Sequence, residues 1–269
     1  MEYPPIGLIQ GRLTPSNGRG VQFFPHGSGE WEKEFELAPA AGISYIQWIC
    51  ESDSLLFKKE GQEAVRAVME RTGVAVHNMD LHELLTKTDI ALQLDELFEK
   101  ICSGLAAING GTVELPMMEE SSLLSKETYE VRVAALRRFI AIAKKYNTPV
   151  AVETDLGPAA LATLLEEVPD ITVVYDSGNS AGMGYNIEEE LAAYGTHISN
   201  VHIKDKPVGG TTVPLGTGSV NFQLLFSLLK KINYTGAITL QAARGEDGKE
   251  VETIKKYVEF ITELQKETS

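Results

Sequence analysis

Eight short apolar segments alternate with eight helical patterns along the chain, and each segment ends abruptly in polar residues. The segments are apolar on consecutive residues and rich in Val and Ile, which is typical of parallel strands covered on both faces. The expected strands are Ile6–Leu13, Tyr45–Cys50, Val74–Met79, Thr112–Pro116, Pro149–Thr154, Thr172–Tyr175, Asn200–Ile203 and Ala237–Leu240.

Between these strands, apolar residues recur at the spacing of one helix face. The expected helices are Trp31–Ala41, Gln62–Thr72, Leu92–Ile108, Glu127–Tyr146, Pro158–Glu167, Ile187–Tyr194, Asn221–Ile232 and Val251–Lys266. Strict alternation over 269 residues, with no linker-like segment, predicts an α/β fold. We expect a single (β/α)₈ TIM barrel, with residues 1–269 forming one domain.

The amino-acid composition limits which kinds of partner the protein can bind and in which compartment it is expected. The net charge of −14 argues against nucleic acid as a partner, because binding its backbone needs clustered Lys and Arg. Two cysteines without a CxxC motif favour a reducing compartment. The N-terminal residues lack a basic region followed by an apolar segment, and no apolar run approaches the roughly 20 residues that span a bilayer. We therefore expect a cytoplasmic protein with no membrane partner.

Four polar residues follow or end successive predicted strands, five to eight: Glu153, Asp176, His202 and Gln241. Barrel enzymes carry their chemistry at the C-terminal strand ends, and neighbouring strands stand about 4.8 Å apart, so these side chains can converge. Two carboxylates, an imidazole and an amide oxygen suit one divalent ion, Mn²⁺, Mg²⁺, Co²⁺ or Zn²⁺. The pattern predicts a metal site, although each residue alone is equally typical of a helix cap or a core residue.

The motifs VETD, YDSGN, VHIKD with PLGTGSVNF, and the opening GLIQGRL resemble the xylose-isomerase-like (AP-endonuclease family 2) sugar isomerases and epimerases. The resemblance covers essentially the whole chain and is most specific from Val201 to Phe222. It implies a (β/α)₈ barrel with one divalent metal, often Mn²⁺, held by Glu, Asp, His and Glu from strands five to eight. Glu153, Asp176 and His202 match that ligand set.

The fourth ligand departs from the family, because Gln241 stands where Glu is usual. In the family's keto-sugar epimerases, two glutamates exchange a proton on opposite faces of the sugar. An amide can ligate through its carbonyl oxygen but cannot act as a general base. Glu153 is then the expected catalytic carboxylate, with His77 and Glu114, near the predicted ends of strands three and four, as candidate replacements for the second base. A packed structural role for His77 is equally open.

Several other polar residues follow the strands closely and are candidates for holding substrate hydroxyls or a phosphate. The candidates are Gln10, Arg12, Glu114, Asn179, Lys204, Asp205 and Arg244. Rim salt bridges are the alternative role for the lysine and arginine residues. The loop after the first strand, TPSNGRGVQFFPHGSGEW, holds Phe23, Phe24 and Trp31 and is long enough to cover a substrate.

The favoured function is isomerisation or epimerisation of a small sugar or sugar phosphate through a metal-stabilised enediolate. A single carboxylate base favours aldose–ketose isomerisation, because one face suffices. A sugar dehydratase and a non-catalytic sugar-binding barrel, in which Gln241 marks lost catalysis, stay open. The related nucleases use a trinuclear zinc site rich in histidine, which five histidines match poorly. Relatives often pair, so a homo-oligomer is compatible with the sequence.

Overall fold

The computed structural model describes residues 4–16, 31–51, 53–81 and 94–267, and its eight strands close into a parallel barrel in chain order. The strands are β1 Ile6–Ile9, β2 Tyr45–Ile49, β3 Ala75–Asp80, β4 Thr112–Met117, β5 Val150–Thr154, β6 Ile171–Asp176, β7 Ile198–Ile203 and β8 Ala237–Leu240. Pairing of β8 with β1 closes the ring. The predicted (β/α)₈ TIM barrel is confirmed.

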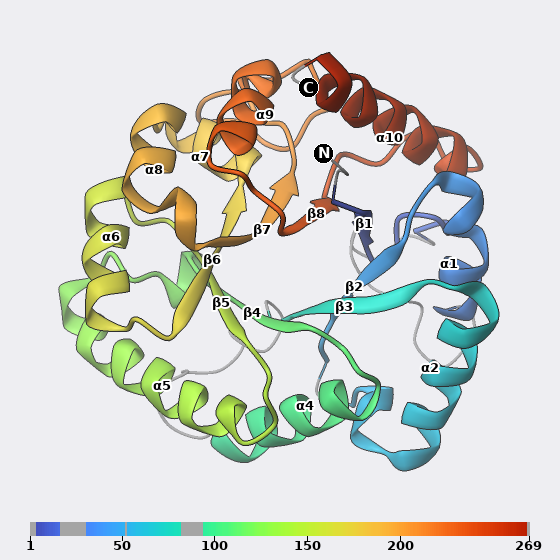
Figure 1. The fold of residues 1–269 in the computed structure, drawn as a ribbon, viewed down its shortest axis with the longest axis horizontal. Coiled ribbons are helices and arrows are strands. Elements are labelled where there is room, and N and C mark those ends of the chain that lie inside the picture. Colours follow the sequence, from blue (N-terminus) through green and yellow to red (C-terminus); the bar gives the residue numbers. More distant parts are fainter. Residues whose placement is uncertain (1–3, 17–30, 52, 82–93, 268–269) are drawn as a thin grey trace.

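Helices surround the strands and cover their outer faces (Figure 1). The described helices are α1 Trp31–Leu37, α2 Lys59–Thr72, α4 Asp95–Ala107, α5 Lys126–Lys144, α6 Pro158–Glu167, α7 Ser177–Met183, α8 Ile187–Tyr194, α9 Phe222–Lys231 and α10 Glu250–Glu267. Because layers on both sides exclude water, every residue of β1, β2 and β8 is buried. This is why the strands are apolar without alternation.

Two local features differ from the sequence expectations. The first strand ends at Ile9 instead of Leu13, because the chain turns at Gly11, whose φ of 76° is open to glycine at little cost. A short helix, α7, which the sequence did not predict, begins directly after β6 and is capped by the side chain of Asp176.

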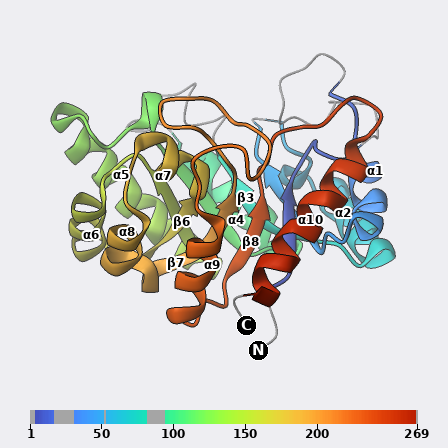
Figure 2. The same cartoon turned by 90° about the horizontal axis from the view of Figure 1, so that it is seen from above.

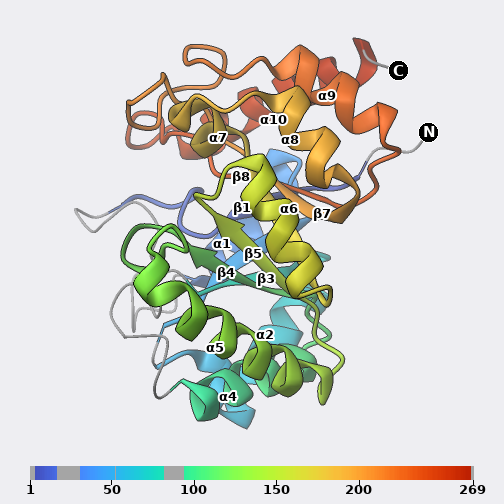
Figure 3. The ribbon, with the colours of Figure 1, turned by 90° about the vertical axis from the view of Figure 1, so that its left-hand side faces the viewer.

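The C-terminal strand ends open on one side of the barrel. Figures 2 and 3 show α7 and the loop from β7 to α9 on this side, away from the labelled chain ends. Of the predicted covering loop, Phe23 and Phe24 lie outside the described residues, whereas Trp31 begins α1 and packs against Phe35 and Trp48. No helix in the described segments is both long and apolar enough to cross a bilayer.

Candidate active site

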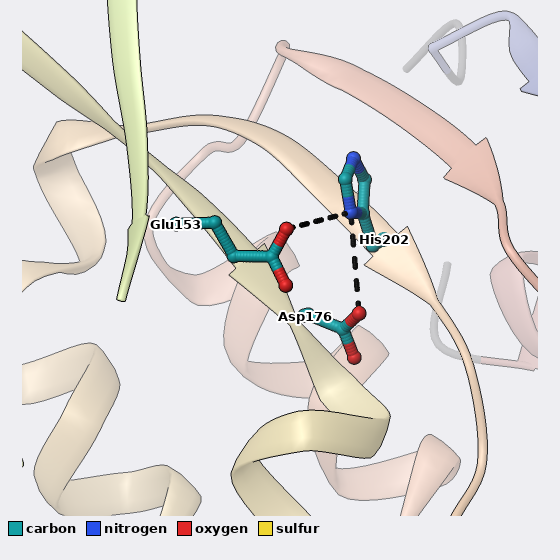
Figure 4. A group of neighbouring side chains, drawn as sticks. All are labelled: Glu153, Asp176 and His202. Atoms are coloured by element: carbon teal, nitrogen blue, oxygen red, sulfur yellow. Dashed lines mark ion pairs between the residues drawn. The ribbon is translucent and has the colours of Figure 1, made fainter. Parts of the chain in front are cut away.

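Three predicted ligands converge at the open end of the barrel: Glu153 from β5, Asp176 from the end of β6 and His202 from β7. Each offers one ligand atom, and these atoms lie within 4.8 Å of one another. Nδ1 of His202 lies 3.6 Å from Oε2 of Glu153 and 4.0 Å from Oδ2 of Asp176. Figure 4 shows both carboxylates turned toward this one ring nitrogen. We call these three residues the Glu–Asp–His cluster.

The remaining oxygen of each carboxylate is held by Asn179 in the first turn of α7. The Asn179 backbone N–H donates to Oδ1 of Asp176 at 2.7 Å, and its side-chain amide donates to Oε1 of Glu153 at 2.6 Å. Lys206 in turn donates to Oδ1 of Asn179 at 2.6 Å. These bonds leave one oxygen of each carboxylate directed at His202.

His202 is oriented from below by Glu114, a buried carboxylate of β4. Nε2 of His202 lies 3.2 Å from Oε2 of Glu114, which also accepts a hydrogen bond from Gln47 at 2.8 Å. The other Glu114 oxygen accepts from Asn200 at 2.7 Å. Metal-ligating histidines commonly hold their second nitrogen on a carboxylate in this way, which fixes the ring and its tautomer.

The electrostatics of the cluster favour positive charge at its centre. Burial alone would lower the pKa of His202, but the carboxylates of Glu114 and Glu153 raise it to about 10. Burial alone would raise the pKa of Glu153, yet His202, Lys204 and Asn179 hold it at about 2. The Glu153 carboxylate is therefore ionised at neutral pH.

The residues present fit a divalent ion. Nδ1 of His202 is buried and, within the described part of the chain, makes no hydrogen bond, although it faces two carboxylate oxygens. A ring nitrogen directed at two anionic oxygens, with its other nitrogen held on Glu114, is the donor set of a mixed N/O site.

Gln241 follows β8 directly and joins the cluster through Lys204. Oε1 of Gln241 accepts a hydrogen bond from Nζ of Lys204 at 3.1 Å, and the same nitrogen lies 2.9 Å from Oδ2 of Asp176. The Lys204 side chain is only 14% exposed. Burial alone would lower the pKa of Lys204, but Asp176 and Glu153 raise it above its ordinary value.

A cavity of about 160 Å³ opens beside the cluster. The described residues that line it are Ile9, Asp80, Pro116, Met118, Glu119, Glu153, Asn179, Lys204, Lys206 and Gln241. The sequence analysis missed Asp80, Met118, Glu119 and Lys206. Asp80 could have been found, because it ends β3 as Asp176 ends β6.

Glu114 and His77 lie deeper in the barrel than the C-terminal ends of β3 and β4, near which the sequence analysis expected them. Glu114 is 1% exposed and is not among the residues lining the cavity, because it lies beneath His202. Strand β3 continues three residues past His77 to Asp80, and the His77 carbonyl accepts from Gly111 at the start of β4. His77 therefore lies in the lower half of the barrel, where its ring packs edge-on against Tyr45.

Asp205 anchors a loop and is not among the described residues that line the cavity. Its fully buried carboxylate accepts hydrogen bonds from the backbone N–H groups of Gly216, Gly218 and Val220 at 2.8–3.1 Å. A Cβ atom on Gly218 would lie 2.2 Å from Oδ1 of Asp205. The KD…GTGSV motif is thus explained by the packing of a loop on a carboxylate.

Gln10, Arg12 and Arg244 also lie outside the cavity lining. The side-chain oxygen of Gln10 accepts from the Ile49 N–H at 2.8 Å. Arg244 donates to the carbonyl groups of Gly11 and Thr14 and so secures the turn after β1. Arg12 is buried beside Arg244, and burial together with this second cation lowers the pKa of Arg12 to about 10. Of the predicted substrate-binding residues, the cavity contains Asn179 and Lys204.

Comparisons with known proteins agree with the barrel fold. Residues 35–264 match a family model described as xylose isomerase-like TIM barrel. The protein named "Putative L-ribulose-5-phosphate 3-epimerase SgbU" of Haemophilus influenzae is 27% identical over 238 residues, which cover 78% of this chain and 83% of that protein.

Two further proteins are similar to this chain, one in the sequence of about half of the chain and one in its fold. An inosose dehydratase of Clostridium tetani is 27% identical over 158 residues, 49% of this chain and 53% of that protein, so the match spans about half of its length. The solved structure of the IOLI protein with a zinc atom has a TM-score of 0.72 at 18% identity, and the match covers 88% of this chain and 94% of that one.

Proposed function

Because the chain belongs to the xylose isomerase-like TIM barrel family, we propose that it is a divalent-metal-dependent isomerase or epimerase of a small sugar or sugar phosphate. The observation that carries the proposal is the Glu–Asp–His cluster, whose ligand atoms lie within 4.8 Å of one another beside a cavity. The relative from Haemophilus influenzae, whose name describes a sugar-phosphate epimerase, supports this reaction class.

Glu153, Asp176, His202 and the amide oxygen of Gln241 would hold the ion, for which we propose Mn²⁺. The zinc atom in the IOLI structure supports a divalent ion in this fold. Such an ion supplies Lewis-acid stabilisation of the negative charge that develops next to a carbonyl when a proton is removed.

Proton transfer falls to Glu153, the one predicted ligand carboxylate that also lines the cavity. It would take the proton from the hydroxyl-bearing carbon next to the carbonyl and return it to the carbonyl carbon, while the hydroxyl proton passes to the former carbonyl oxygen. Since Gln241 cannot accept a proton, one carboxylate on one face favours aldose–ketose isomerisation. Epimerisation would require a second carboxylate, and Asp80 and Glu119 line the same cavity.

The cations of the cavity favour a sugar phosphate over a neutral sugar. Lys204 and Lys206 both line it, and the hydrogen-bond partner of Lys206 is the neutral amide oxygen of Asn179. Ammonium groups bind phosphate as point charges. The carboxylates in the lining repel an anion, so the phosphate would lie at the lysine side of the cavity.

Two measurements test the proposal. Elemental mass spectrometry of protein purified without chelators should find about one divalent ion per chain, and Glu153→Ala should lose it, whereas Glu259→Ala on exposed α10 should not. Ketoses and aldoses, each with and without phosphate, should then exchange the proton next to the carbonyl in D₂O, as seen by NMR. Absence of metal binding, even with added Mn²⁺, would refute the mechanism.

The similarity to an inosose dehydratase favours one second candidate, a sugar dehydratase. It would use the same ligands and the same proton abstraction, followed by loss of water. A product two hydrogens and one oxygen lighter than its substrate would identify this reaction, whereas isomerisation leaves the mass unchanged.

A further inference from the structure

Lys204 occupies the oxygen atoms that the proposed metal ion needs. Its Nζ lies 2.9 Å from Oδ2 of Asp176 and 3.1 Å from Oε1 of Gln241. We infer that the Lys204 ammonium is a built-in competitor of the divalent ion and thereby sets the metal affinity of the site. This inference rests on the proposed metal site, and it adds that Lys204 determines how readily a metal ion occupies that site.

The competition follows from how Asp176 is held. Oδ1 of Asp176 accepts the Asn179 backbone N–H at 2.7 Å, so Oδ2 is the oxygen left for a cation, and it faces Nδ1 of His202 at 4.0 Å. A metal ion bonds such an oxygen at about 2.0–2.2 Å. An ion at that distance and an ammonium 2.9 Å from the same atom lie within about 5 Å of each other, so they repel strongly.

Burial prevents water from relieving this repulsion at the ammonium, because only 14% of the Lys204 side chain is exposed. Lys204 lines the cavity beside the cluster, so the cavity gives the ammonium somewhere to move. Binding of the ion therefore requires Lys204 to give up hydrogen bonds to Asp176 and Gln241.

The neutral side chain of Gln241 strengthens the competition between the metal ion and the Lys204 ammonium. The cluster has two ligand carboxylates, Glu153 and Asp176, and the fourth predicted ligand is neutral. A divalent ion together with Lys204 brings three positive charges against these two negative ones. A carboxylate at position 241 would balance both cations, so the effect of Lys204 on metal affinity should depend on the residue at 241.

Mn²⁺ binding tests the inference, with free Mn²⁺ measured by electron paramagnetic resonance. Lys204→Met should tighten binding by roughly 10- to 100-fold, since hydrogen bonds to charged groups no longer compete. Lys206→Met is the matched control: it removes the same charge from the same loop and cavity, but its bond is to Asn179. It should change affinity by less than about 3-fold.

A double-mutant cycle isolates the coupling. Gln241→Glu should tighten binding by itself, and in that background Lys204→Met should have a much smaller effect than in the wild type. Thermal unfolding of each metal-free variant shows whether it is folded. Lys204→Gln provides a second, polar replacement should Lys204→Met not fold.

The outcomes separate this inference from the proposed function. Equal affinities of wild type and Lys204→Met, with binding lost in Glu153→Ala, would overturn the inference and leave the metal site standing. An equal gain in Lys206→Met would also overturn it. Binding by Lys204→Met alone would support the inference and refute metal dependence of the wild type. No binding by any variant would overturn both.

Discussion

Replacement of Glu114 by Gln should weaken both the fold and the metal site, although the residue touches neither the cavity nor the proposed ion. Its two oxygens accept from Asn200, Gln47 and His202, and the side chain is 1% exposed. In the Glu114→Gln variant, an amide oxygen at the Oε2 position can still accept hydrogen bonds from Gln47 and His202. Its NH₂ group then faces the NH₂ group of Asn200.

Asn200 cannot turn its amide over without loss, because its oxygen accepts from Thr239 at 3.0 Å. The variant therefore loses one hydrogen bond to a charged group, worth about 1.5–3 kcal/mol, and the two others lose their charge assistance. We expect a loss of about 3 kcal/mol in the free energy of unfolding. For a chain of this size that lowers Tm by about 6 °C.

The functional consequence of Glu114→Gln is looser orientation of His202. Loss of the partner of a ligating histidine commonly costs 10- to 100-fold in metal affinity. Calorimetric unfolding and Mn²⁺ titration measure the two effects, with Glu259→Gln on the exposed face of α10 as the control. Unchanged Tm and unchanged Mn²⁺ affinity in Glu114→Gln would refute the assigned role of this carboxylate.

Two other substitutions test how the site is supported. Gly218→Ala should lower Tm by several degrees, because its Cβ would lie 2.2 Å from Oδ1 of Asp205; an unchanged melting curve would contradict the packing explanation of the GTGSV segment. Burial raises the pKa of Glu190 despite hydrogen bonds from Ser180, Tyr194 and Tyr175. The protonated form is then favoured in the folded state, so wild-type stability falls as pH rises above about 4.5 toward the folded pKa. In urea unfolding, the stability of Glu190→Gln relative to wild type should increase as pH rises above about 4.5, and a difference that stays constant with pH would contradict this.

The strand-end rule located the cluster because parallel strands place their C-terminal ends together. For Glu153, Asp176 and His202, the residue type and the position at a strand end were enough to predict that the side chains meet. A carboxylate or imidazole at the C-terminal end of one strand reaches its neighbours on the adjacent strands. The rule does not predict how far below the open end of the barrel a strand residue lies. Glu114 is also a strand carboxylate, but three residues separate it from the end of β4, so it supports the site from below.

Roles of the loop residues were harder to predict because backbone groups compete for their side chains. Asp205 accepts hydrogen bonds from backbone N–H groups, and Arg244 donates hydrogen bonds to backbone carbonyl groups. The positions of these backbone groups depend on loop conformation. The pattern that selected them cannot distinguish a loop anchor from a substrate contact. Lys206 was missed for the same reason, since its place in the cavity depends on how the loop after β7 folds.

The unpredicted helix α7 shows why the cluster has its geometry. Asp176 is at once the last residue of β6 and the N-cap of α7, so capping fixes its Oδ1 and directs Oδ2 at His202. Three residues along, Asn179 supplies the capping N–H and, through its side chain, fixes Oε1 of Glu153. A capping interaction and a ligand position are therefore two uses of the same carboxylate, and the two roles weighed for Asp176 in the sequence are compatible.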